Sequence, residues 1–252
     1  MHPAWSIIFF TSISGLGLGL AGLIVLGLLD LSLFSHLLIA SSAVFGLIGA
    51  GLLSSTLHLG HPERAWRALS QWRSSWLSRE GVLAILVLAS LGCWFFFTLF
   101  FGPPPLWSGI LILLLIVATV YATSMIYGSL KTVACWHHPL TPVCYLMFSA
   151  CGGSVAFLTM LALFGQASPG ILTEITLAFL IGAWILKYAW WWALDNRGSA
   201  SNLETATGLG MIGKVRSLMP PHTSENYLQK EMGFVVARRH AIKLRYISIV
   251  FG

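Results

Sequence analysis

Long intervals without a charged residue dominate this sequence. No charged residue precedes Asp30, and none lies between Asp30 and Glu63, between Glu80 and Lys131, or between Lys131 and Glu174. A membrane-spanning helix needs about 20 consecutive apolar residues, so each interval has room for at least one span. The apolar residues run continuously and do not alternate with polar ones, which favours helices over a membrane β-barrel.

The sequence therefore predicts an all-α fold, a polytopic transmembrane helical bundle with six complete spans. Gly102-Pro103-Pro104-Pro105 cannot continue a helix and separates the third span from the fourth. Residues 166–170 separate the fifth from the sixth in the same way. The predicted spans are Trp5–Leu29, His36–Leu57, Glu80–Phe101, Trp107–Leu130, Pro142–Phe164 and Ile171–Leu194.

Three regions follow from this division. Residues 1–194 form the predicted bundle, residues 195–240 a polar loop, and residues 241–252 the start of a seventh span. The last apolar run begins at Tyr246 and is short, so we expect the natural chain to extend beyond Gly252. The first apolar run is too long for a signal peptide and lacks a positive start, so we expect it to remain in the mature protein.

Charge decides both the class of protein and its predicted orientation. Only 9% of the residues are charged, against about 25% in soluble domains, which excludes a soluble enzyme, a disordered chain and a nucleic-acid-binding module. Thirteen of the 14 Lys and Arg residues fall on one side of the predicted bundle, and Lys187 lies inside the sixth span. By the positive-inside rule, we expect that side and the N-terminus in the cytoplasm, with the protein in the bacterial inner membrane.

One motif known from soluble proteins is rejected, and the cysteines form no metal-binding pair. Residues 17–22 match G-x-G-x-x-G, but they lie inside a predicted span and not after a strand. Gly15 and Gly19, with Gly46 and Ala50 in the second span, instead suggest small-residue faces for close helix contact. The four cysteines, at positions 93, 135, 144 and 151, form no C-x-x-C pair, so we expect no metal site in this protein.

His58 and Glu80 are the candidate catalytic residues. His58 ends the second predicted span and Glu80 opens the third, so both lie at similar depth near the cytoplasmic boundary. Reduction of a quinone moves two protons, and an imidazole and a carboxyl can hold and release them near neutral pH. The alternative is purely structural: His58 caps one helix, and Glu80 lies in the first turn after an N-capping Ser78.

The same segment resembles a known family. L-H-L-G-x-P-x-R-A at residues 57–65 and S-x-L-S-x-E at residues 75–80 are similar to the membrane-anchor subunits of the dimethyl sulfoxide reductase family. Residues 127–133, Trp136 and Thr141-Pro142 are similar to it as well. The opening residues 1–4 and the stretch 225–245 look most like one branch, the anchors of cytoplasmic quinone-linked sulfite dehydrogenases.

The resemblance implies several features that composition does not. Such anchors have eight spans and carry no haem or metal. They bind a quinone, ubiquinone or menaquinone, at a histidine and a glutamate that fall on His58 and Glu80. They hold an iron–sulfur electron-transfer subunit and a molybdopterin catalytic subunit, which carry iron–sulfur clusters and a molybdenum bis-guanine-dinucleotide pterin.

Four further residues are candidates for the quinone site or its rim. The rings of Trp72, Trp76 and Tyr127 can pack on the quinone head group, although tryptophans in membrane proteins are often interface residues. Arg64 lies at the cytoplasmic rim, where it either contacts lipid headgroups or docks the iron–sulfur subunit.

The sequence and the resemblance together predict a subunit of an oxidoreductase complex that oxidises sulfite to sulfate. This subunit does not catalyse the sulfur chemistry, but passes the electrons to membrane quinone. One alternative is an anchor of a dimethyl sulfoxide reductase-type complex, which runs from quinol to a terminal acceptor. Two other classes are a haem-b anchor, which needs paired histidines at mid-depth, and a small transporter, which needs broken helices and ionisable groups near the midplane.

Overall fold

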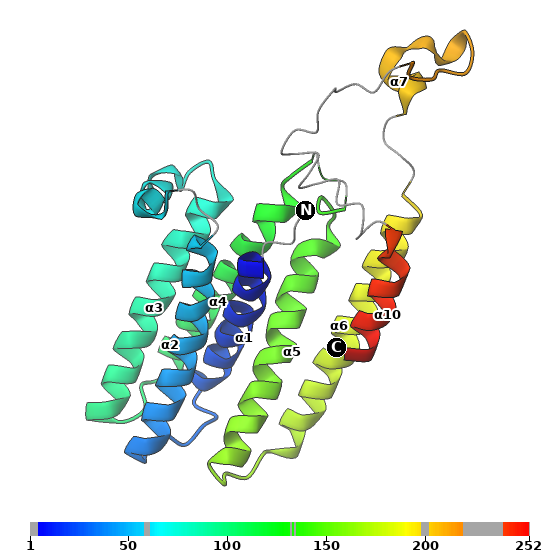
Figure 1. Ribbon diagram of the computed structural model, residues 1–252. Coiled ribbons are helices and arrows are strands. Elements are labelled where there is room, and N and C mark those ends of the chain that lie inside the picture. The colour runs from blue at the N-terminus through cyan, green and yellow to red at the C-terminus, as the bar shows by residue number, and fades with distance from the viewer. Residues whose placement is uncertain are drawn as a thin grey trace. The chain divides into compact units, whose positions relative to one another are not determined.

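The computed structural model describes residues 5–57, 61–131, 133, 135–197, 202–218 and 239–251. They fall into two compact units, of which one is Trp5–Asp195 and the other contains the residues from Asn196 onward. The larger unit is a bundle of long helices that lie roughly side by side (Figure 1).

Six helices in the described residues are long and apolar enough to cross a membrane. They are α1 (Trp5–Ile24), α2 (Phe34–Thr56), α3 (Trp76–Phe101), α4 (Leu106–Gly128), α5 (Leu140–Leu163) and α6 (Gly170–Asp195). The predicted all-α bundle of six spans is thus confirmed. Between α2 and α3 lies a 3₁₀ segment, η1 (Pro62–Gln71), which packs against α3.

The helix ends differ most from the prediction at α1 and α3. Helix α1 ends at Ile24 and not at Leu29, because the backbone turns at Gly27, whose φ of 75° suits only glycine well. Helix α3 begins at Trp76, four residues before the predicted start at Glu80. Glu80 therefore lies beyond the first turn of its helix.

Helix α1 is central in the bundle because it packs against α2, α4 and α5. Helix α3 pairs with α4, and α6 pairs with α5. The common core consists of large side chains that are almost completely buried, among them Leu20, Ile24, Ile48, Leu91 and Phe157. Apolar side chains on the outside of the helices remain exposed, as expected for surfaces that face lipid.

Glycines bring the α1 backbone against its neighbours. A Cβ atom at Gly19 would overlap the carbonyl oxygen of Ser149, and one at Gly153 would overlap the backbone of Gly19. By contrast, a Cβ atom at Gly15 or Gly46 would meet no atom within 4 Å. The small-residue contact predicted for α1 is therefore present at Gly19, while Gly15 and Gly46 make no such approach.

The loops at the end of the bundle opposite η1 are joined by one side chain. Gln166 donates from Nε2 to the Asp30 carbonyl at 2.8 Å and accepts from the Asp30 amide at 2.9 Å. The Ser32 amide donates to Oδ1 of Asp30 at 2.9 Å, and this hydrogen bond lowers the pKa of the Asp30 carboxyl. His36 stacks on Phe164 with ring centroids 4.1 Å apart.

The second unit contains short helical segments in its described parts. Helix α7 (Leu203–Thr207) begins at Asn202, whose side chain accepts from the Thr205 amide at 2.7 Å. It ends at Gly208, which adopts a left-handed conformation, and is followed by η2 (Leu209–Met211). Helix α10 spans Ala241–Phe251 and contains the last basic residues of the sequence, Lys243 and Arg245.

Candidate functional site

Glu80 is a carboxyl group buried between two helices. Its side chain is 5% exposed, and Oε1 accepts a hydrogen bond from the Thr123 hydroxyl on α4 at 2.5 Å. An acidic side chain within a membrane-spanning segment costs free energy to bury. Such a residue therefore marks a functional site more often than a structural one. Glu80 thus combines deep burial with a polar partner from a neighbouring helix.

The capping alternative for this residue is wrong. The N-cap of α3 is Ser75, and Ser78 lies inside the helix, where its hydroxyl donates to the carbonyl of Ala68 in η1. Ser78 is 1% exposed. Because the helix starts earlier than predicted, Ser78 ties η1 to α3 and leaves Glu80 with no role at the helix terminus.

His58, the other candidate catalytic residue, lies outside the described residues together with Leu59 and Gly60. The description resumes at His61, whose Nδ1 lies 3.0 Å from Oε1 of Glu63. Arg64 follows in η1 with an exposed side chain, and its Nε lies 3.7 Å from the same Glu63 oxygen.

Arg79 organises the turn that leads into α3. Its guanidinium donates from Nε to the Trp72 carbonyl at 3.0 Å and from Nη2 to the Arg73 carbonyl at 2.7 Å. The same group lies over the ring of Trp76, 4.4 Å from the centroid. Trp76 in turn meets Tyr121 on α4 edge-on, at 5.8 Å. Trp72 itself is 53% exposed.

Tyr127, near the end of α4, belongs to a cluster of aromatic rings. It stacks with Tyr145 on α5 at a centroid distance of 6.0 Å and meets Trp136 edge-on at 5.3 Å. These three rings line a cavity of about 280 Å³, to which α6 contributes Lys187 and Trp190.

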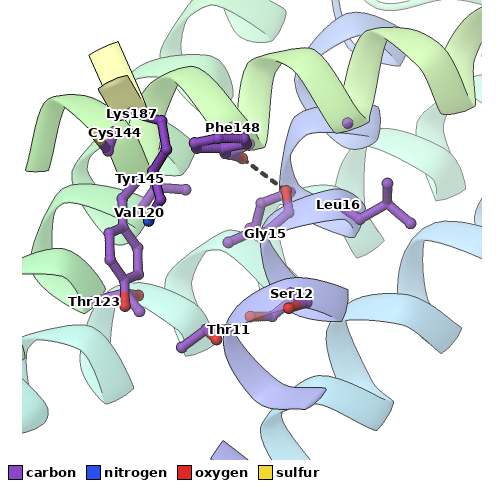
Figure 2. A pocket seen from close by; sticks show the side chains of 14 residues that line it. Thr11, Ser12, Gly15, Leu16, Val120, Thr123, Cys144, Tyr145, Phe148 and Lys187 are labelled. Atoms are coloured by element: carbon purple, nitrogen blue, oxygen red, sulfur yellow. Dashed lines mark hydrogen bonds between the residues drawn. The ribbon is translucent and has the colours of Figure 1, made fainter. Parts of the chain in front are cut away.

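A larger cavity of about 470 Å³ lies next to it, inside the bundle (Figure 2). Its size falls within the range of about 300–1,000 Å³ typical of small-molecule sites. Thr123 lines this cavity and also donates its hydrogen bond to Glu80. Lys187 extends into the same cavity from α6. The other lining residues are Thr11, Ser12, Ser14, Gly15, Leu16, Leu18, Val120, Cys144, Tyr145, Phe148, Ser149 and Gly152.

The structure brings two of the predicted site residues to these cavities. Tyr127 lines the smaller one, and Glu80 reaches the larger one through Thr123. Within the described residues, Arg64 and Trp72 lie in the exposed segment before α3 and outside the lining of both cavities. Trp76 contacts the bundle through Tyr121 and lies outside both linings as well.

Three residues at this site were not predicted from the sequence: Thr123, Tyr145 and Lys187. Thr119 and Thr123 lie four residues apart in α4, which places two hydroxyls on one helix face. Lys187 was recognisable as the one basic residue within a predicted span. Neither pattern says which helix the side chain faces.

In the part of the sequence that the structure describes, no group of three or more His, Cys, Asp or Glu side chains could hold a metal ion. The polar groups at the cavities include hydroxyls, an ammonium, a thiol, indole N–H groups and, through Thr123, a carboxyl. Such groups can donate hydrogen bonds and move protons to a bound organic molecule.

Comparison with known proteins assigns the family. The family model described as DMSO reductase anchor subunit (DmsC) matches residues 1–198. The chain belongs to this family. Its six apolar helices are thus the membrane-spanning part of an anchor subunit.

Two curated relatives are similar to this anchor subunit. The C subunit of sulfite dehydrogenase from Allochromatium vinosum is 37% identical over 175 residues, which cover 61% of this sequence and 53% of the relative. The C polypeptide of anaerobic dimethyl sulfoxide reductase from Escherichia coli K12 is 30% identical over 130 residues, which cover 49% of this sequence and 45% of the relative. The protein thus matches about half the length of each relative. No solved structure is significantly similar to it.

Proposed function

We propose that this protein is the membrane anchor and quinone-reactive subunit of a molybdenum and iron–sulfur oxidoreductase. In this proposal it receives electrons from an iron–sulfur subunit and passes them to membrane quinone. The observation that carries the proposal is the Glu80 carboxyl, buried and hydrogen-bonded to a threonine that lines a cavity large enough for a quinone ring.

Sulfite is the proposed substrate of the whole complex. The similarity to the sulfite dehydrogenase relative is higher in identity and longer than the similarity to the dimethyl sulfoxide reductase relative. The molybdenum subunit would oxidise sulfite to sulfate with water as the oxygen donor and release two electrons. The anchor takes no part in the sulfur chemistry.

The proposed orientation places the η1 end of the bundle in the cytoplasm. Thirteen Lys and Arg residues lie in the loops and helix ends predicted for that side, and the opposite loops contain none. The iron–sulfur subunit would dock on the same face, where η1 presents Arg64 and Arg67. Electrons would then enter the bundle at the end that holds Glu80 and the two cavities.

The decisive experiment compares two activities of one purified complex. His58→Ala and Glu80→Gln should leave assembly and sulfite oxidation with a soluble artificial acceptor intact. Quinone-linked activity should fall at least about tenfold in each. His58→Ala removes a hydrogen-bond donor to the quinone, which costs about 1.5 kcal/mol or more in a dry site, and Glu80→Gln removes a proton source. Normal quinone-linked activity in both assembled variants would remove the quinone step from this protein.

A further inference from the structure

Three cavities follow one another along α1. The smaller polar cavity is lined on α1 by Ile7, Ile8 and Thr11, and the larger one by residues from Thr11 to Leu18. A third cavity of about 260 Å³ continues from Leu18 to Leu26. Neighbouring cavities share lining residues, so the three lie next to one another in order from the η1 end of α1 to its other end.

The chemistry of the lining changes from one cavity to the next. Thr123, Tyr145 and Lys187 supply polar groups to the larger cavity. The third cavity is lined almost entirely by apolar side chains from α1, α4, α5 and α6, with Ser149 as its one hydroxyl. A quinone has a polar part and an apolar part in the same way: a ring with two carbonyl oxygens, and an apolar isoprenoid tail.

We propose that the quinone ring binds in the cavity of about 470 Å³, with its tail in the apolar cavity, and that Thr123 relays a proton from Glu80 to the ring. Lys187 binds the second ring oxygen from α6 in this arrangement. The inference rests on the proposed quinone function and assigns the ring position and two residues that act on it.

Thr123 can act as a relay because a hydroxyl can accept one hydrogen bond while it donates another. It donates to Oε1 of Glu80 at 2.5 Å, and the carbonyl of Thr119 lies 3.1 Å from the same hydroxyl. A hydroxyl has one hydrogen and two acceptor lone pairs. When Glu80 is protonated, its O–H can donate to the Thr123 oxygen, and the Thr123 hydrogen is then available to a ligand in the cavity.

Lys187 approaches the ring site from the other side. Its Nζ lies 4.4 Å from the centroid of the Trp190 ring and 5.4 Å from that of Trp191, contacts that attract a charged amine. The side chain extends into the cavity that Tyr145 also lines (Figure 2). An ammonium group in this place supplies hydrogen-bond donors and positive charge where a reduced quinone develops negative charge.

The proton and electron balance is as follows. Two electrons from the iron–sulfur subunit reduce the quinone. One ring oxygen takes the hydrogen of Thr123, which is replaced by the Glu80 proton. The second oxygen takes a proton from the Lys187 ammonium. Glu80 and Lys187 regain one proton each from the aqueous side at the η1 end, so quinone, two electrons and two protons give quinol.

The relay is tested with Thr123→Val and Thr123→Ser in the purified complex. The probe is decylubiquinone or a naphthoquinone of equal tail length, whichever the wild-type complex reduces faster. In Thr123→Val the kcat with quinone should fall at least about tenfold, since proton transfer by a positioned group contributes at least that much. Its KM should change little, and Thr123→Ser should restore most of the kcat.

Thr119→Val is the matched control for this relay. Thr119 is as buried as Thr123 on the same helix, and its hydroxyl donates to the Leu115 carbonyl at 2.8 Å. Its backbone carbonyl remains in the variant. Thr119→Val should keep wild-type quinone kinetics. A wild-type kcat in Thr123→Val would overturn the relay.

Ring position is tested without relying on activity. A photoreactive azidoquinone should label the peptides that contain Tyr145 and Lys187. Lys187→Met should reduce labelling and raise the KM for quinone about tenfold, as expected for a lost charged hydrogen bond. Its kcat should fall as well, because the second ring oxygen loses its proton donor. Lys187→Arg should retain part of the binding. Labelling confined to residues 58–80 would overturn the proposed ring position.

The outcomes separate this inference from the proposed function. Normal quinone kinetics in Thr123→Val and Lys187→Met, together with loss in His58→Ala and Glu80→Gln, would contradict the inference and leave the function standing. Normal kinetics in assembled His58→Ala and Glu80→Gln would overturn the function itself.

Discussion

The Thr123 hydroxyl on α4 donates to the Glu80 carboxyl on α3 at 2.5 Å, and it joins two membrane-spanning helices through their polar groups. Both side chains are buried, Glu80 at 5% and Thr123 at 7% exposure. Hydrogen bonds between membrane helices stabilise a bundle by only about 0.6–2 kcal/mol each. A buried carboxyl left without a donor costs more, about 1–3 kcal/mol.

Thr123→Val should therefore destabilise the bundle by about 1–3 kcal/mol, because Glu80 loses its donor in a site that water reaches poorly. The free energy of unfolding can be measured in mixed micelles with increasing dodecyl sulfate. Thr119→Val, whose hydroxyl bonds within its own helix, should change stability by a smaller amount.

A double-mutant cycle tests whether the pair acts as a unit. Glu80→Gln keeps a polar oxygen that can accept from Thr123, and Glu80→Leu removes it. The effects of Thr123→Val and Glu80→Leu should be non-additive by at least about 0.5 kcal/mol, since the second change adds little once the pair is broken. Additive effects would mean that the two side chains contribute independently to stability.

The contact between α1 and α5 gives a second prediction. A Cβ atom at Gly153 would lie 2.5 Å from the Gly19 Cα, with backbone and not a flexible side chain as the obstacle. Gly153→Ala should therefore destabilise the bundle by about 1–3 kcal/mol by forcing the helices apart. Gly46→Ala is the control, because a Cβ atom there meets nothing within 4 Å.

Gly46→Ala should leave the free energy of unfolding unchanged or raise it by up to about 1 kcal/mol, since alanine favours a helix more than glycine does. Thermal unfolding of both variants in the same detergent measures the difference. Equal stability of the two variants would show that the close approach of Gly19 and Gly153 is not maintained in the membrane protein.

The bundle was predictable because charge-free runs and proline-rich breaks depend only on the order of residues. Its six helices match the six predicted spans, with end shifts of up to five residues. The start of α3 was misplaced because Arg79 and Glu80 look like a polar boundary. In the structure Arg79 folds back onto the carbonyls of Trp72 and Arg73, while Glu80 turns inward to Thr123.

The cavity side chains were not predictable because they depend on helix rotation. An apolar run with no strong amphipathic pattern does not say which of its faces meets the bundle. Thr123 and Tyr145 become neighbours of one cavity only when α4 and α5 pack with a particular rotation about their axes. The sequence placed Lys187 inside the sixth span without saying which way it faces, and in the structure it lines both polar cavities.

Gln166 supports a third prediction, at the end of the bundle opposite η1. Its amide makes two hydrogen bonds to the backbone of Asp30 and so joins the α1–α2 loop to the α5–α6 loop. Gln166→Ala should lower the free energy of unfolding by about 1 kcal/mol, because both bonds are exposed to solvent and each contributes modestly. Gln166→Glu retains only the acceptor and should fall between the wild type and Gln166→Ala.

The proposed orientation gives the last prediction. Thirteen Lys and Arg residues on one side against none on the other make the topology signal strong. A green fluorescent reporter fused after Gln71 or Lys214 should fluoresce, and an alkaline phosphatase fused at those points should be inactive. Fusions after Leu33 or Pro104 should give the reverse pattern. Active phosphatase after Gln71 would place η1 outside the cytoplasm, and an iron–sulfur subunit docked on η1 would then have to be exported.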